Sequence, residues 1–142
     1  MRKHKFTILF IIYACLVITL SSIPNIPTPE LPDKISPDKI AHFTQYFIFA
    51  FLYFKFRESR GGYKKDILIE LFFLGILISI LNELYQICIP GRTFSWWDTL
   101  ANLFGFLSWI GLYLIKNKRG KNENNQHKKG TSSDRSIFTS NP

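Results

Sequence analysis

Cysteine is scarce in this chain, which has only two, Cys15 and Cys88. Two cysteines are too few for the disulfide framework of a small secreted domain. The sequence also lacks an internal repeat and a glycine-rich phosphate loop, so neither a repeat architecture nor a P-loop nucleotide site is indicated. Acidic residues are few as well, 10 against 18 lysines and arginines, which leaves a formal net charge of +8.

Long apolar runs are what the sequence has in abundance. Apolar residues make up 46% of the 142 residues, and 14 residues are phenylalanine. A membrane-spanning helix needs about 20 mostly apolar residues, and these runs show no strand alternation. Because backbone groups in lipid must be satisfied within the chain, helices are expected. We predict an all-α, polytopic membrane protein, a bundle of about four transmembrane helices at residues 6–23, 37–56, 67–89 and 97–115.

The four runs form one predicted transmembrane domain, residues 1–115. The second run is short and is expected to cross with a small thinning of the bilayer. The first run follows the basic start MRKHK, a pattern also typical of a signal peptide. Its best small-residue cleavage site, Thr19-Leu20-Ser21, is poor, so an uncleaved anchor is expected. Cys15 lies inside this run and is expected to be a small buried hydrophobe.

Basic residues indicate the orientation. Fifteen of the 18 lie near the start of the chain, in the stretch 55–65, or after residue 115. The positive-inside rule then places both termini in the cytoplasm and residues 24–39 and 90–96 outside. This predicts a multi-pass protein of the plasma membrane. Because the basic groups flank helices, they are explained as topological anchors, and no nucleic-acid partner is expected.

Two segments lack apolar runs. Residues 24–37 hold five prolines and are expected to be extended and partly stiff. Residues 116–142 are basic, polar and rich in Asn, Lys, Ser and Gly. This second segment has too little apolar surface to form a core, so we predict a disordered cytoplasmic tail.

Polar residues recur at helical spacing in the last three runs. A polar stripe in a membrane helix faces protein or water, because facing lipid costs a few kcal/mol per charged group. All three stripes lie at the predicted outer ends, with Glu83 roughly 10 Å below the turn at Pro90. They predict one shallow polar pocket that opens outward. The stripes are Asp38, His42 and Gln45; Gly75, Ser79, Asn82 and Gln86 with Glu83 beside them; and Asp98, Asn102 and Gly105.

Several of these residues also have structural explanations. Ser36-Pro37-Asp38 is typical of a helix start, with a cap, a first-turn proline and an acid near the helix dipole. Ser95-x-x-Asp98 fits a capping box. Both acids could therefore serve the helix ends alone.

Core packing explains others. His42, Gln86 and Asn102 could act only as hydrogen-bonding groups between helices, and Ala101-x-x-x-Gly105 predicts close helix packing. Glu70 lies off the polar stripe, near the cytoplasmic end. It is expected to pair with Lys64 or Lys65.

Glu83 is harder to explain, because it is an acid inside a membrane helix with no capping role. Such a group must be protonated or paired, and Arg92 and His42 are the candidate partners. A structural pair and a functional site both stay open for this residue.

The stretches DKIAHFTQYFIFAFL and NELYQICIPGRTFSWWDTLANLFG together resemble the VanZ-like family of small bacterial membrane proteins. The family pattern has an Asp-Lys-x-x-His-Phe helix start, then Glu-x-x-Gln, a Pro-Gly-Arg turn, and Asp-x-x-x-Asn followed by Gly. The resemblance covers about residues 6–115. It implies a membrane protein, with some members linked to resistance to the glycopeptide antibiotic teicoplanin, and it implies no settled reaction. The matching residues are Asp38, Lys39, His42 and Phe43; Glu83 and Gln86; Pro90, Gly91 and Arg92; and Asp98, Asn102 and Gly105.

Two uses of the predicted pocket stay open. In the first, the protein binds or modulates a lipid-linked cell-envelope component through anion-holding residues. In the second, it is an enzyme on such a lipid, with acid/base chemistry at the pocket, although no nucleophile is evident. The ligand-binding candidates are Asp38, Lys39, Gln86, Arg92 and Asn102, and the catalytic candidates are His42, Glu83 and Asp98.

Other classes are less well supported. One histidine with dispersed acids is a weak metal signal, so we predict no metal and no cofactor. A proton-coupled transporter is disfavoured, because a relay needs ionisable groups through the full membrane depth. An oligomer stays open, since phenylalanine-rich faces suit lipid and a second copy equally.

Overall fold

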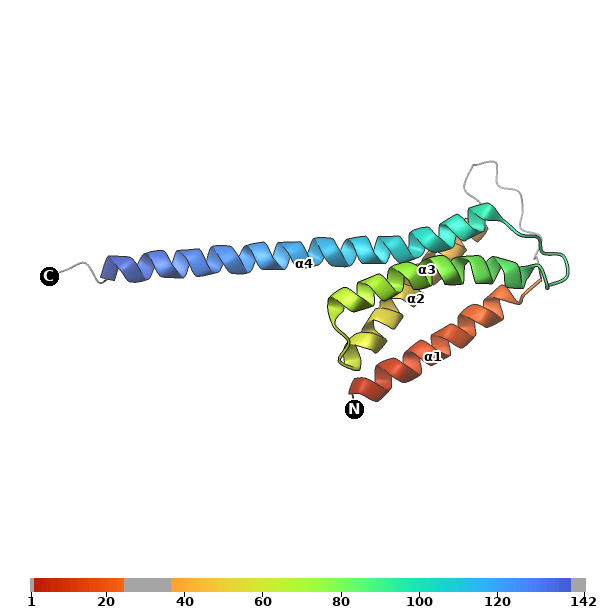
Figure 1. Ribbon diagram of the computed structural model, residues 1–142, viewed down its shortest axis with the longest axis horizontal. Helices are drawn as coiled ribbons and strands as arrows, with labels where there is room; N and C mark the ends of the chain where they lie inside the picture. The colour runs from red at the N-terminus through yellow and green to blue at the C-terminus, as the bar shows by residue number, and fades with distance from the viewer. Residues whose placement is uncertain (1, 25–36, 139–142) are drawn as a thin grey trace. The chain divides into compact units, whose positions relative to one another are not determined.

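Four helices make up the part of the chain that the structure, a computed structural model, describes: residues 2–24 and 37–138 (Figure 1). No strand occurs in those residues. The predicted all-α membrane bundle is confirmed. The helices are α1 (Arg2–Ser21), α2 (Pro37–Ser59), α3 (Lys64–Gln86) and α4 (Trp96–Phe138).

The ends of the helices differ somewhat from the predicted ones. α3 ends at Gln86, three residues before the predicted end, because the backbone tightens into a turn ahead of Pro90. In that turn the N–H of Cys88 donates to the carbonyl of Tyr85 at 3.0 Å. The predicted extended stretch, apart from its two end prolines, and the predicted cap Ser36 lie outside the described residues.

Three helices contain a stretch long and apolar enough to cross a membrane: His4–Ser21, Lys64–Gln86 and Trp96–Asn122. Their apolar side chains lie largely on the surface, as Ile12 and Phe73 do at 61% and 65% exposure. A water-soluble protein rarely exposes so much apolar area, whereas lipid covers it without cost. The chain is therefore an integral membrane protein. Cys15 is exposed on α1, so its predicted burial is wrong, because an apolar residue in lipid has no need of a protein core.

α2 is the most enclosed helix. It packs against α1 and α3 (Figure 1), and Tyr46 contacts Phe106 of α4 with 5.7 Å between ring centroids. α2 is not among the three apolar stretches, which are defined by length and composition alone, and neighbouring helices cover several of its residues. Its 23 residues extend roughly 34 Å at 1.5 Å per residue, enough for a hydrocarbon core of about 30 Å. Its buried residues are His42, Tyr46, Phe49, Ala50, Leu52 and Phe54.

Gly105 allows the backbones of α2 and α4 to touch. A Cβ at this position would lie 2.5 Å from the carbonyl oxygen of Phe43 and 2.8 Å from the backbone nitrogen of Phe47. No side chain larger than hydrogen fits there without moving a helix. The close packing predicted from Ala101-x-x-x-Gly105 is confirmed, and it sets the distance between the polar groups one turn away.

An ion pair joins α2 to α3 at the end of the bundle where α2 ends. The guanidinium of Arg57 donates to both carboxylate oxygens of Glu70, through Nε at 2.7 Å and Nη2 at 2.5 Å. The expected pairing of Glu70 with Lys64 or Lys65 is wrong. Lys64 lies 3.5 Å from Glu58 instead, because the short turn between the helices brings Arg57 directly beside Glu70.

The chain divides into two compact units, Met1–Ile110 and Gly111–Pro142. All the candidate site residues belong to the first unit. α4 continues to Phe138, whereas the sequence predicts a helix ending at 115 and a disordered tail over 116–142. An isolated polar helix of this composition has no apolar face to bury and is only marginally stable in water. The tail therefore stays a prediction.

Candidate functional site

Hydrogen bonds tie together the helix ends at one end of the first unit, where α1 and α3 end and α2 and α4 begin. We call this the polar end. The Ser21 hydroxyl donates to Asn82 Oδ1 at 2.7 Å, which joins α1 to α3. His42 Nδ1 lies 2.9 Å from Asn102 Oδ1, which joins α2 to α4. These bonds join the helices in two pairs, and the N–H of Ser95, just before α4, links the pairs by donating to Glu83 of α3.

Glu83 lies at the centre of the polar end and has no exposed surface. Its Oε2 accepts from the backbone N–H of Ser95 at 3.3 Å, and its Oε1 accepts from Asn82 Nδ2 at 3.4 Å. Both distances exceed the usual range for such bonds. A carboxylate can accept about four hydrogen bonds, so these two long ones leave Glu83 weakly held.

Neither expected partner of Glu83 forms an ion pair with it in the described part of the chain. Arg92 directs its Nε to the carbonyl of Ile23 at 3.0 Å, and His42 lies beside Asn102 and Asp38. The structure thus connects α3 to α4 through the backbone of Ser95. Among residues 2–24 and 37–138 no lysine or arginine forms an ion pair with Glu83, and His42 is near enough to interact with it electrostatically.

The start of α4 forms half of the predicted capping box. The backbone N–H of Asp98 donates to Ser95 Oγ at 3.3 Å, as a cap residue requires. In a complete box the acid three positions on would accept the N–H of the cap residue, but here Glu83 accepts it. The Asp98 carboxylate is consequently released from capping.

His42 is nearly enclosed, with 5% of its surface exposed. Its Nδ1 faces Asn102, and its Nε2 lies 3.8 Å from Asp38 Oδ1. Asp98 completes the group: one ligating atom from each of Asp38, His42 and Asp98 lies within 4.8 Å of the others. The three come from the first two turns of α2 and the first turn of α4, about sixty residues apart in sequence.

Some buried donors at the polar end lack a partner among the described residues. Gln86 Nε2 and Asn102 Nδ2 are both buried without a hydrogen bond, although buried amides in native proteins are nearly always satisfied. Lys39 and Arg92 are partly exposed, and neither pairs with an acid in the described ranges. Four of the five predicted ligand-binding residues are thus two buried amide donors and two cations nearer the surface. The fifth, Asp38, is an exposed acid beside His42.

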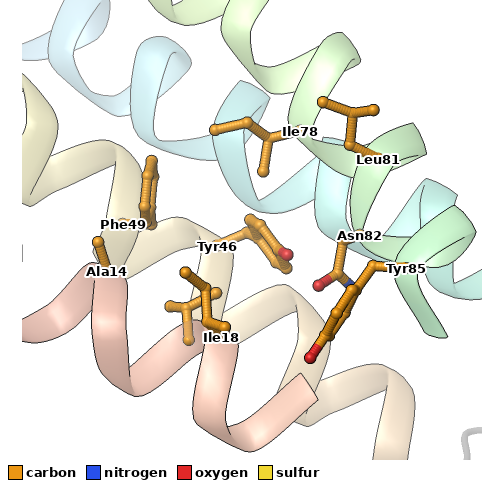
Figure 2. Close-up of a pocket in the computed structure, with 9 residues that line it drawn as sticks. Ala14, Ile18, Tyr46, Phe49, Ile78, Leu81, Asn82 and Tyr85 are labelled. Atoms are coloured by element: carbon orange, nitrogen blue, oxygen red, sulfur yellow. The ribbon is translucent and has the colours of Figure 1, made fainter. Parts of the chain in front are cut away.

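Sequence reasoning did not single out an apolar cavity beside the polar end. The cavity has a volume of about 430 Å³ and lies between α1, α2 and α3 (Figure 2). Asn82, Tyr46 and Tyr85 are the lining residues with polar atoms, and the Tyr85 hydroxyl lies 2.7 Å from Ser22 Oγ. In the sequence, the only sign of this contact was the pair Ser21-Ser22 at the end of the first apolar run, since both serines bond to residues of α3. The lining residues are Ala14, Val17, Ile18, Tyr46, Phe49, Ile78, Leu81, Asn82 and Tyr85.

Comparison with known proteins yields one match. The model of the family described as VanZ/LLP1 matches residues 18–117, more than two thirds of the chain. The matched range contains every candidate site residue, from Asp38 to Asn102. No curated protein and no solved structure matches the chain.

Proposed function

The chain belongs to the VanZ/LLP1 family, and from that premise we propose that it binds a lipid-linked component of the cell envelope at the polar end. The polar end takes the head group of that molecule, and the adjoining cavity takes part of its hydrocarbon chain. Through this binding the protein modulates an envelope component and contributes to glycopeptide resistance, teicoplanin resistance in particular.

The observation that carries the proposal is the continuity of the two regions through Asn82. This residue lines the apolar cavity and also bonds to Ser21 and Glu83 of the polar end. A lipid-linked molecule has the same construction, an apolar chain joined to a polar head. The cavity volume of about 430 Å³ falls within the roughly 300–1,000 Å³ of small-molecule sites.

The head group is anionic in this proposal. Arg92 keeps part of its guanidinium free, since only its Nε has a hydrogen bond in the described residues, and a guanidinium suits phosphate or carboxylate. The unpartnered amides of Gln86 and Asn102 supply further donors. Ligand oxygens would satisfy these buried groups, whose desolvation otherwise costs about 1–3 kcal/mol each.

The polar end faces outward. Lys55, Arg57 and Lys64 lie at the opposite end of α2 and α3, and the positive-inside rule assigns such an end to the cytoplasm. Both termini are then cytoplasmic, in the plasma membrane. An outward site agrees with a ligand in the envelope, where glycopeptides also act.

Filling the cavity tests the proposal. Ile78→Trp adds bulk inside the lining, whereas Phe73→Trp changes a side chain on the same helix that is 65% exposed and outside the cavity. We expect Ile78→Trp to reduce the lipid-linked envelope component retained by the purified protein at least tenfold, and Phe73→Trp to leave it unchanged. Equal retention in both variants would contradict the role of the cavity.

A second candidate function is catalysis on the same kind of lipid. It is favoured by the position of the His42 imidazole between Asn102 and two carboxylates, because an oriented imidazole beside an acid is suited to proton transfer. In this reading Glu83 or Asp98 is the base and His42 the acid or positioning group. Glu83→Gln would then keep lipid binding but abolish turnover, whereas a binding protein has no turnover to lose.

A further inference from the structure

We propose that Asp38, His42 and Asp98 bind one divalent transition-metal ion, with zinc or manganese as the fitting species. The sequence alone predicts no metal here, because the acids are separated by sixty residues and only one histidine is available. The packing of α2 against α4 is what brings the three side chains together. The proposal concerns this ion site itself and stands whether or not the ligand is lipid-linked.

The separations suit ligands of a common ion. His42 Nε2 and Asp38 Oδ1 are 3.8 Å apart, too far for a hydrogen bond. Two ligands that each bind zinc at 2.0–2.2 Å in a tetrahedral arrangement lie about 3.4 Å from each other. All three candidate ligand atoms lie within 4.8 Å of one another, so small side-chain rotations bring them to that geometry.

The orientation of His42 is the second, independent observation. The side chain is 7% exposed, and its Nδ1 bonds to Asn102 Oδ1 at 2.9 Å. A carbonyl oxygen accepts, so Nδ1 is the donor in this bond and Nε2 is the ring nitrogen directed at Asp38. Nε2 makes no hydrogen bond among the described residues, so it is available as a metal ligand. Ligating histidines usually have their other nitrogen held by just such an oxygen.

The excess of negative charge around His42 also favours a bound cation. Asp38 and Asp98 lie close together, and the buried Glu83 is near enough to Asp98 for the two acids to interact electrostatically. Helix N-termini favour both aspartates, by roughly 0.3–1 kcal/mol each, but this does not explain why they converge on a histidine. Among the described residues neither aspartate pairs with a lysine or arginine. A divalent cation neutralises the group.

The ligand set favours zinc or manganese over magnesium or calcium. Imidazole nitrogen suits transition metals, whereas magnesium and calcium prefer oxygen ligands alone. Three protein ligands also leave a coordination position open, as in zinc sites that bind a further ligand. Asp38 is 47% exposed, so that position is accessible from outside the protein. If the proposed function holds, a phosphate of the lipid-linked molecule occupies it, and the ion removes the repulsion between that phosphate and the acids.

Titration with Zn²⁺ alone tests the site. The full chain, purified in detergent and treated with a chelator, is titrated by isothermal calorimetry, and bound zinc is counted by elemental analysis. We expect one zinc per chain, with affinity at least tenfold lower in Asp38→Asn and in Asp98→Asn. Both variants keep the shape of the side chain, and melting curves verify that they remain folded. His42→Gln should lose binding as well.

The controls are an acid and a histidine elsewhere. Asp66→Asn removes the first-turn acid of α3, as the test variants do in α2 and α4, and His4→Gln removes an exposed histidine of α1. Both should bind zinc as the wild type does. The proposal is overturned if the wild type binds none, if folded Asp38→Asn and Asp98→Asn bind normally, or if the controls lose as much. Lipid content, measured in the same samples, reports separately on the proposed function.

Discussion

Replacing Gly105 by alanine tests the contact that positions the polar end. The new Cβ would lie 2.5 Å from the Phe43 carbonyl oxygen and 2.8 Å from the Phe47 nitrogen, whereas carbon–oxygen contacts normally lie at about 3.3–3.6 Å. Both neighbours are backbone atoms, so relief requires α2 and α4 to separate by roughly 1 Å. We expect overpacking to lower the free energy of unfolding by about 1–3 kcal/mol, offset by up to about 1 kcal/mol from alanine's helix propensity.

The same separation should weaken the site, because the His42–Asn102 hydrogen bond lies one turn away and is 2.9 Å long. Thermal unfolding in detergent measures the loss of stability. Gly111→Ala is the matched control, since a Cβ there meets no atom within 4 Å, and its melting temperature should stay level or rise. Gly75→Ala should also lower the melting temperature, because its Cβ would meet Cγ and Cβ of the fully buried Phe106 at 2.9 and 3.0 Å. Equal melting temperatures for the Gly105 and Gly111 variants would refute the packing argument.

Two further predictions concern topology and the tail. In a chain whose native cysteines are replaced, an impermeant thiol reagent should label a cysteine at position 28 from outside, but not one at 59 or 125; outside labelling at 59 would reverse the orientation. Truncation after Lys121 should leave membrane insertion and zinc binding intact, because the polar tail has little apolar surface with which to dock. Loss of insertion in the truncated protein would show that the tail belongs to the folded bundle.

The helices and the polar end were predictable because their signals are local. Apolar runs of the required length indicate membrane helices, and helical spacing places Asp38 and His42, or Asp98 and Asn102, on one face. Membrane depth then implies that the ends of successive helices meet. The structure agrees, since Glu83 bonds to Ser95 and His42 to Asn102.

The choice of individual partners was not predictable, because it depends on distances between helices. Glu70 lies within a few residues of Lys64 and Lys65 along the chain, yet Arg57 of the neighbouring helix binds it. Glu83 takes the N–H of Ser95 that the capping box assigns to Asp98. That exchange leaves the Asp98 carboxylate free to lie beside Asp38 and His42. No local sequence pattern predicts it.

The length of α4 and the apolar cavity are also beyond local reasoning. Hydropathy predicts an end near residue 115, where apolar residues stop, and gives no signal for the helix that continues to Phe138. The cavity lies between Ala14 and Ile18 of α1 on one side and Ile78 of α3 on the other (Figure 2). Each of these side chains individually is typical of a residue that faces lipid.

The central claim is that the polar end and the cavity together bind a lipid-linked envelope molecule. Its most direct test is mass spectrometry of the lipids that co-purify with the wild-type chain from bacterial membranes. The account predicts a phosphate-bearing, lipid-linked envelope component, retained at about one per protein and depleted in Arg92→Ala, because the guanidinium is the main anion-binding group. Recovery of only the bulk membrane phospholipids, in their ordinary proportions and unchanged in Arg92→Ala, would contradict it.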